Sequence, residues 1–359
     1  METLLEYKCP ACGGALNFDS SVQKMKCPYC DTEFEVAVLQ ELDEVLQQEQ
    51  PSTYIWDTEP QSKWSADETE NLCRFVCQSC GGEIVGDQNT AATNCPYCDN
   101  PVVMAGQFRG DLRPDLVIPF QLNKEQAKAA LASHLNKKPL LPKLFRSQNR
   151  MESIQGIYVP FWLFDTDVQA NIRYHATRIH HWSDSNYNYT RTSHYSLLRS
   201  GSVGFNNVPV DGSSKMADAL MESIEPYDLT KGVDFQTAYL AGYLADKFDV
   251  SADACKNRAN DRIRASTESV FAATTAGYAS VIPEHTNIQL KDGRVRYALL
   301  PVWILTTRYA DKCYTFAMNG QTGKMVGDLP IDWKRFVAYL LSIGLGSGAL
   351  ISLIACLLG

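Results

Sequence analysis

Two Cys-x-x-Cys turns, Cys9-Pro10-Ala11-Cys12-Gly13-Gly14 and Cys27-Pro28-Tyr29-Cys30-Asp31, decide the fold of the first part of the chain. Fourteen residues separate them, so the turns can face each other and present four sulfurs tetrahedrally, as Zn²⁺ prefers. The Gly-Gly pair suits backbone with positive φ beside a metal. We therefore predict a zinc ribbon over residues 1–35, closed by Cys9, Cys12, Cys27 and Cys30.

The same pattern returns further along the chain. A shift of 68 residues places the four cysteines on Cys77, Cys80, Cys95 and Cys98, and both Gly-Gly and Cys-Pro-Tyr-Cys-Asp recur. Such self-similarity is typical of an internal duplication. The sequence thus predicts a second zinc ribbon over residues 76–101.

Thiols with this spacing also serve other chemistries. Thioredoxin-like redox proteins use Cys-x-x-Cys, but they need one pair beside a βαβ unit rather than two matched pairs twice over. Iron in a rubredoxin-like site is a rival, because a Cys-Pro-x-Cys turn also suits iron. We expect two structural Zn²⁺ ions, since cysteines fill all four positions of each site and leave none open for catalysis.

Composition limits the classes of partner. The chain has 359 residues, of which 45% are apolar and 21% charged, and its formal net charge is −8. Each four-thiolate zinc site would add a further net charge of about −2. Nucleic-acid binding draws on clustered Lys and Arg, so we expect nucleic acid to be an unfavoured partner.

Cysteine usage indicates the compartment. Eight of the twelve cysteines fall into Cys-x-x-Cys pairs, and residues 1–30 show no signal peptide. A secreted disulfide framework would normally follow one, so we expect a reducing compartment with metal-bound thiolates.

Residues 36–75 change character. Val38, Leu39, Leu42, Val45 and Leu46 recur at helical spacing and predict a short amphipathic helix. Residues 47–70 are rich in Gln, Glu, Asp, Ser and Thr and indicate an acidic linker. Its two tryptophans are either docking points for a partner or fold back on the second ribbon, and both readings stay open here: Trp56 and Trp64.

Residues 102–332 predict one α+β domain. Strand-like runs cover residues 116–120, 158–164, 168–179, 294–309 and 313–326, with Asn319-Gly320 as a turn signal. Helices are expected from Lys124 to Lys137 and from Ser251, a plausible cap, to Ala273.

The last segment, residues 336–359, contains no charged residue. A helix of that length spans a hydrocarbon core of about 30 Å. We expect a single transmembrane helix, with a buried core helix as the alternative. Lys334 and Arg335 flank its start, which places the N-terminal domains in the cytoplasm at the cell membrane. The small residues Gly344 and Gly348 could pack a homodimer, or form an incidental cluster.

Signs of catalysis are weak. Residues 320–325 resemble a Walker loop, but Met318 and Met325 replace required residues, so we predict a hairpin turn. A second metal site is conceivable in a histidine-rich segment, although no ligand spacing recurs and polar strand residues are the favoured reading: His175, His180, His181, His194 and Asp184. We expect no enzymatic activity.

The tandem ribbons, the Ile118-Pro119-Phe120 and Val159-Pro160-Phe161-Trp162 segments and the hydrophobic tail resemble bacterial TFIIB-type zinc-ribbon-containing membrane proteins. The resemblance spans nearly the whole chain. Members are often labelled primosomal replication-protein (helicase-like) homologues, a label that would rest here on the cysteines alone. The resemblance implies an envelope-stress setting, in which such proteins help recruit phage-shock-type membrane-maintenance proteins to the bilayer.

The sequence therefore predicts a multidomain protein with two small four-cysteine zinc ribbons, an α+β domain and a C-terminal transmembrane helix. The expected function is a membrane-anchored cytosolic adaptor that docks partner proteins. The alternative is a nucleic-acid-binding ribbon protein of the replication or transcription type, for which Lys8, Lys24 and Lys26 would supply the basic face.

Overall fold

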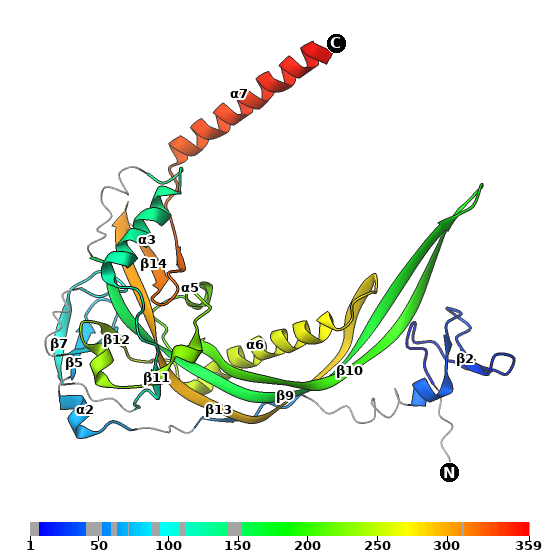
Figure 1. The fold of residues 1–359 in the computed structure, drawn as a ribbon, viewed down its shortest axis with the longest axis horizontal. Coiled ribbons are helices and arrows are strands. Elements are labelled where there is room, and N and C mark those ends of the chain that lie inside the picture. The colour runs from blue at the N-terminus through cyan, green and yellow to red at the C-terminus, as the bar shows by residue number, and fades with distance from the viewer. Residues whose placement is uncertain are drawn as a thin grey trace. The chain divides into compact units, whose positions relative to one another are not determined.

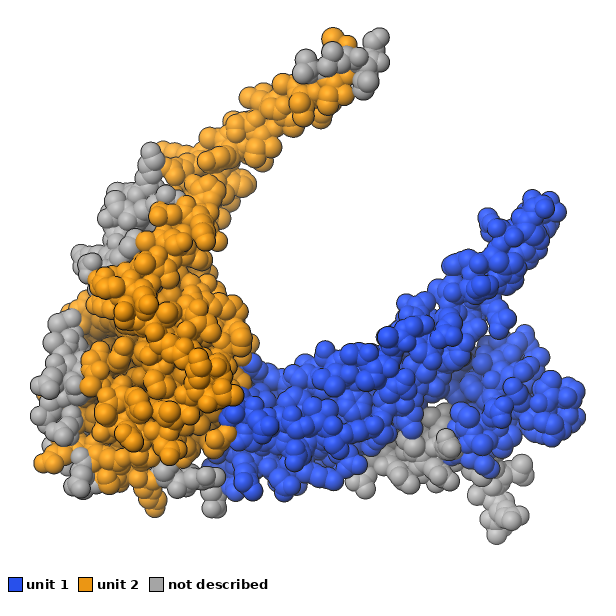
Figure 2. Space-filling view, viewed as in Figure 1, with its two compact units in different colours: residues 1–58, 164–208, 256–295 blue, residues 59–163, 209–255, 296–359 orange. Residues whose placement is uncertain are grey.

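The structure is a computed structural model that describes residues 7–40, 52–58, 63–70, 72–87, 94–107, 112–142, 153–309 and 312–358. It divides into two compact units (Figure 2). Unit 1 comprises residues 1–58, 164–208 and 256–295, and unit 2 comprises residues 59–163, 209–255 and 296–359. The long strands β9, β10 and β13 contribute residues to both units: Gln155–Ser183, Asn188–Asp211 and Ser280–Tyr309.

Unit 1 begins with a small three-stranded sheet in the order β1-β2-β3, with strands Asn17–Asp19, Lys24–Lys26 and Glu33–Phe34. We call residues 7–40 ribbon one. Its core is confined to Cys9, Leu16, Cys27 and Leu39, with a few partly buried neighbours. Residues 36–40 are helical, and the remainder of the helix predicted there lies outside the described residues.

The other part of unit 1 is a sheet of long strands. β9 pairs with β10 and with β13, and helix α6 (Ala252–Ala273) lies along them (Figure 1). The helix buries Ala259 and Ile263. Its start is the predicted one, because Ser251 Oγ accepts a hydrogen bond from the Ala254 backbone N–H (3.3 Å). The short strand β4 (Trp56–Asp57) pairs with β13 in parallel.

Unit 2 is built on strands in the order β11-β8-β13-β9-β12-β6-β5-β7. The bounds not yet given are β5 Leu72–Cys77, β6 Glu83–Asp87, β7 Val102–Gln107, β8 Leu116–Val117, β11 Val233–Asp234, β12 Leu244–Asp246, β14 Lys312–Asn319 and β15 Met325–Gly327. The Walker-like loop is the predicted turn, since β14 pairs with β15 on either side of it.

Helices surround this sheet. They are α2 (Ala66–Glu70), α3 (Lys124–Asn136) and α5 (Asp218–Ser223), with 3-10 turns η2 (Leu229–Lys231) and η3 (Thr237–Leu240). The predicted helix at Lys124 is confirmed. Asn123 and Gln126 exchange hydrogen bonds in a capping box, which satisfies backbone donors that a helix start leaves free. Ala127, Leu131 and Leu135 are buried on one face of α3.

The compact units do not coincide with the predicted boundaries. Residues 102–332, expected as one α+β domain, are shared between the units. Residues 76–101, expected as a separate ribbon, lie in unit 2. The physical reason is strand pairing: β6 of this ribbon pairs with β12, with Val85 opposite Ala245, so the ribbon extends a larger sheet. We call residues 72–107 ribbon two.

The chain closes with helix α7 (Trp333–Leu358). Its base is held by unit 2, because the Asp332 N–H donates to Leu140 O (2.9 Å) and Arg335 Nη1 donates to Leu141 O (3.2 Å). Residues 333–351 are long and apolar enough to cross a membrane, and none of the 18-residue window in this helix is buried by the rest of the described chain. The apolar helix expected at this end is therefore present.

Candidate metal centres

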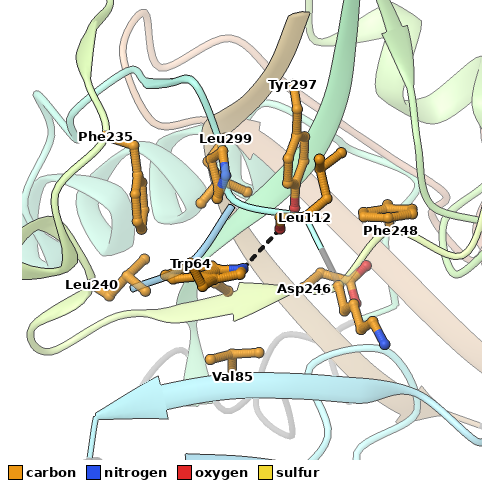
Figure 3. Close-up of a pocket in the computed structure, with 12 residues that line it drawn as sticks. Trp64, Val85, Leu112, Phe235, Leu240, Asp246, Phe248, Tyr297 and Leu299 are labelled. Carbon is orange, nitrogen blue, oxygen red and sulfur yellow. Dashed lines mark hydrogen bonds between the residues drawn. The ribbon is translucent and has the colours of Figure 1, made fainter. Parts of the chain in front are cut away.

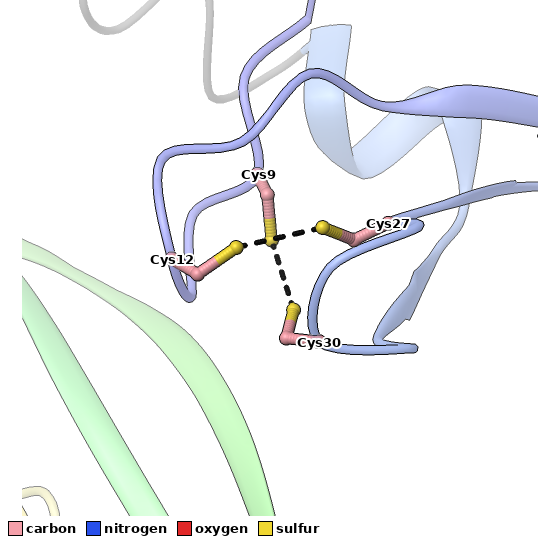
Figure 4. Close-up of side chains that lie close together, drawn as sticks. All are labelled: Cys9, Cys12, Cys27 and Cys30. Carbon is pink, nitrogen blue, oxygen red and sulfur yellow. Dashed lines mark hydrogen bonds between the residues drawn. The ribbon is translucent and has the colours of Figure 1, made fainter.

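The four cysteines of ribbon one converge, as Figure 4 shows, with their sulfurs pointing toward one another. Cys9 and Cys30 sulfurs lie 3.6 Å apart, and those of Cys12 and Cys27 lie 3.5 Å apart. These distances are far longer than a disulfide bond of about 2.05 Å. A tetrahedral ion about 2.3 Å from each sulfur would set the sulfurs about 3.8 Å apart, so the group fits a metal.

The second group repeats this geometry. Cys77 and Cys98 sulfurs lie 3.5 Å apart, and those of Cys80 and Cys95 lie 3.7 Å apart. In each group all four sulfurs lie within 4.8 Å of one another. The structure therefore brings the eight predicted cysteines together in two sets of four, each positioned to bind a metal ion. Within the described residues no other group of three or more His, Cys, Asp or Glu side chains does so.

The backbone conformation explains why Gly follows the first Cys-x-x-Cys turn of each ribbon and Asp follows the second. Each turn places a left-handed residue after its second cysteine: Gly13 and Gly81 at φ of 75° and 68°, Asp31 and Asp99 at 54° and 59°. That residue donates its N–H to the carbonyl of the first cysteine at 2.8–3.0 Å. The predicted role of the first glycine is confirmed, and the Asp of Cys-Pro-Tyr-Cys-Asp fills the same position, which Asp tolerates better than most residues.

One thiol at each site is prepared for metal binding. A hydrogen bond with the Thr32 side chain lowers the pKa of Cys30 to about 6. Burial opposes ionisation of Cys98, but hydrogen bonds from Asn100 lower its pKa to about 7. Burial raises the pKa of Cys9 to about 12. The metal's own charge must therefore drive deprotonation of such thiols, so binding releases protons.

The two Cys-Pro-Tyr-Cys turns have the same sequence but differ in how far they are buried. Tyr29 of Cys-Pro-Tyr-Cys is 77% exposed, whereas Tyr97 at the equivalent position is 9% exposed. Cys77, Cys95 and Tyr97 belong to the main hydrophobic core of unit 2, together with Ile157 and Val159 of β9. Thr306 Oγ1 also donates to Pro96 O (2.7 Å). The second cysteine group (site two) is thus part of the core of unit 2, while the first group (site one) belongs to the small core of ribbon one.

A buried carboxyl group, that of Asp246, lies beside Tyr97 of site two. Asp246 on β12 is 2% exposed and accepts a hydrogen bond from Ser213 Oγ (2.6 Å). Burial raises its pKa from 3.8 to about 7, with Asp249 adding to the shift and Ser213, Tyr97 and Lys215 opposing it. Sequence reasoning missed this residue, because only the β6–β12 pairing brings it to the ribbon.

The raised pKa of Asp246 predicts a pH dependence of stability. Asp246 ionises near pH 4 in the unfolded state, whereas in the folded state it keeps its proton until about pH 7. The contribution of protonated Asp246 to the free energy of unfolding is therefore fully present below pH 4 and is lost as pH rises to about 7. Asp246→Asn should remove the loss, which amounts to at most about 4 kcal/mol. Urea unfolding across pH 4–8 measures the difference from wild type.

Asp249→Asn is the comparison variant, for which the opposite effect is expected. Burial opposes ionisation of Asp249, but hydrogen bonds from Ser214 and the contact with Lys215 lower its pKa. This carboxylate therefore stabilises the fold above its unfolded pKa, and its removal should destabilise the protein at neutral pH. A parallel pH response in both variants would contradict the assignment of the proton to Asp246.

Trp64 closes a small pocket in unit 2 (Figure 3). Its indole N–H donates to Leu112 O (2.9 Å), and its ring packs edge-on against Phe235 with centroids 5.5 Å apart. Val85 of ribbon two and Asp246 also line the pocket, whose free volume of about 20 Å³ holds about one water molecule. The reading in which Trp64 folds back is therefore confirmed.

Trp56 is likewise engaged, in unit 1. It is 8% exposed, packs edge-on against Phe164, and donates its indole N–H to Asn260 Oδ1 (2.9 Å). Trp56 therefore packs within unit 1, and the reading in which it folds back on ribbon two is wrong for this residue.

The predicted histidine cluster is divided. His175 Nε2 and His194 Nδ1 lie 3.0 Å apart across β9 and β10, and His175 Nδ1 lies 3.6 Å from Glu284. His181 instead contacts Thr190 (2.9 Å), and His180 stacks on Trp182. The favoured reading, polar residues of strands, therefore describes this segment.

The chain is 34% identical over 356 residues to YdjG of Bacillus subtilis (strain 168), an uncharacterized protein, and the match covers 99% of each chain. The chain belongs to the YdjG family. No family model and no solved structure matches it. The match thus runs along nearly the whole of both chains, and the resemblance to TFIIB-type proteins stays a prediction.

Proposed function

We propose that this protein is a zinc-bound, membrane-anchored adaptor whose ribbon one docks partner proteins at the inner face of the membrane. The observation that carries the proposal is the contrast between the two ribbons. Ribbon one leaves four large apolar side chains in solvent, whereas ribbon two packs Tyr97 and its cysteines into the core of unit 2. The four exposed side chains are Phe18, Val22, Tyr29 and Val38.

Three further features support this function. Two four-cysteine groups with no open coordination position suit structural Zn²⁺ better than catalysis. Helix α7 is an apolar segment that the described chain does not cover. The envelope-stress setting and the phage-shock-type partners rest on the family resemblance, and we carry them as part of the proposal.

The nucleic-acid alternative finds less support in ribbon one. Lys24 Nζ lies 3.6 Å from Glu35, and Lys26 Nζ lies 3.7 Å from Asp31. Of the three lysines expected to form a basic face, only Lys8 has no ion pair among the described residues. Two thiolate pairs at the metal would add negative charge to this surface.

A pull-down in mild detergent tests the proposal with the full-length chain. Wild type should retain membrane-associated proteins after nuclease treatment, and a Phe18→Ser, Tyr29→Ser variant should lose them at least about tenfold while keeping two zinc ions per chain, since a lost contact of about 1.4 kcal/mol is already tenfold. Val270→Ser, an exposed apolar-to-serine change on α6 away from ribbon one, is the control. Partners that vanish with nuclease, or that depend on Lys8, Lys24 and Lys26, would favour the nucleic-acid function instead.

A further inference from the structure

The end of the β9–β10 hairpin in unit 1 has no covering element in the described chain. The backbone N–H of Ala279, one residue before β13, donates to Thr177 O (2.7 Å), and Glu284 of β13 lies 3.5 Å from Arg173. β13 therefore runs back along β9 from Thr177. All fifteen residues from 178 to 192 are exposed on both faces, and Figure 1 shows the hairpin extending past α6. We call residues 178–192 the hairpin tip.

The hairpin tip carries aromatic side chains that soluble proteins seldom leave in solvent. Trp182 is 45% exposed and Tyr187 67% exposed. Trp182 stacks on Tyr189 across the strands with ring centroids 5.3 Å apart, and His180 stacks on Trp182. Asp184 fixes the turn by accepting the N–H groups of Asn186 and Tyr187. The aromatic residues are thus held in place on a narrow projection.

Arginines flank these rings on the same face. Side chains two or four residues apart share one face of a strand, so Arg178 lies on the face of Trp182, and Arg191 on that of Tyr189. The Arg178 guanidinium also stacks on two rings at the base of the tip, those of Tyr195 and Tyr278, at 5.6 and 5.1 Å from their centroids. The hairpin tip contains two arginines, Arg178 and Arg191, and a single acidic residue, Asp184, in a chain of net charge −8. The local charge is therefore opposite to that of the whole protein.

We propose that the hairpin tip binds the headgroup region of an anionic phospholipid bilayer. Trp and Tyr concentrate at membrane–water interfaces, where an apolar ring with a polar edge is favoured. Arginines beside them pair with lipid phosphates and with the negative potential of an anionic leaflet. A hairpin tip that is exposed along its whole length can enter a fluid interface without a matching groove. The inference rests on anchoring by α7, which would keep the tip at high local concentration near lipid.

The test uses the full-length chain reconstituted in vesicles of phosphatidylcholine with or without an equal part of phosphatidylglycerol. A phosphatidylcholine brominated near the headgroup quenches nearby tryptophan. The emission of Trp182 is obtained as the difference between wild type and Trp182→Phe, since the chain has six tryptophans. This difference signal should shift to the blue and lose most of its intensity in the phosphatidylglycerol vesicles.

Arg191→Glu should restore most of that Trp182 signal. Arg294→Glu, the same charge change at an exposed position of β13, should leave the quenching as in wild type. Unquenched Trp182 in protein that floats with the vesicles would overturn the lipid contact and leave the anchor standing, and shielding of Trp182 only in native membranes would assign the tip to a protein instead. Failure to float would count against the anchor by α7 and, with it, this inference.

Discussion

Cys95→Ser is expected to remove one of two bound metal ions and to unfold unit 2. Cys95 is 1% exposed and belongs to the main core with Phe75, Ile84 and Val159. A structural zinc site contributes about 10–16 kcal/mol to folding, which matches or exceeds the whole stability of a typical domain of about 5–15 kcal/mol. Because β5 and β6 continue into the sheet, loss of the ion should disrupt that sheet as well.

Cys9→Ser should have a local effect. Ribbon one has only its own small core, so this variant should also bind one ion, but limited proteolysis should remove the N-terminal segment and leave the body intact.

Metal content and limited proteolysis of both variants, and of wild type treated with a chelator, provide the measurement. Cys73→Ser is the matched control, because Cys73 is buried on β5 four residues before Cys77 and lies outside the sulfur group. It should keep two ions and a resistant body. A Cys95→Ser protein with one ion and an intact, protease-resistant unit 2 would show that site two does not stabilise the sheet.

A stop codon in place of Trp333 is expected to move the protein entirely from the membrane fraction to the soluble fraction. The truncation removes every residue of α7 and keeps Asp332, whose N–H binds Leu140 O. Unit 2 should therefore stay folded, and the metal content should stay at two ions. Carbonate extraction followed by immunoblotting measures the distribution.

A point variant gives the same test with the chain at full length. Leu345 is 75% exposed on α7, and an arginine near the centre of a membrane span costs about 2.5–3.5 kcal/mol, or about a hundredfold in partitioning. Leu345→Arg should weaken membrane retention, while Trp333→Arg at the helix edge should not. Two results would contradict membrane anchoring by α7. One is wild-type protein released from membranes by carbonate, and the other is truncated protein that still sediments with membranes.

The local parts of this protein could be predicted from sequence. Ligand spacing depends on a few adjacent residues, so the eight cysteines were found by counting, and the structure gathers them in two groups. The helices α3 and α6 start at their predicted caps because capping is a contact between near neighbours. The uncharged tail likewise forms one uninterrupted helix.

Tertiary structure alone decided what those local parts become. Tyr29 and Tyr97 occupy the same position of the same motif, yet one is exposed and the other buried, because β6 of ribbon two pairs with β12, which lies far later in the chain. The same distant pairing buries Asp246 on β12. Neither segment shows in its own sequence which distant strand it will pair with. The sequence therefore predicted two equivalent ribbons, and only the sheet made one of them part of a core.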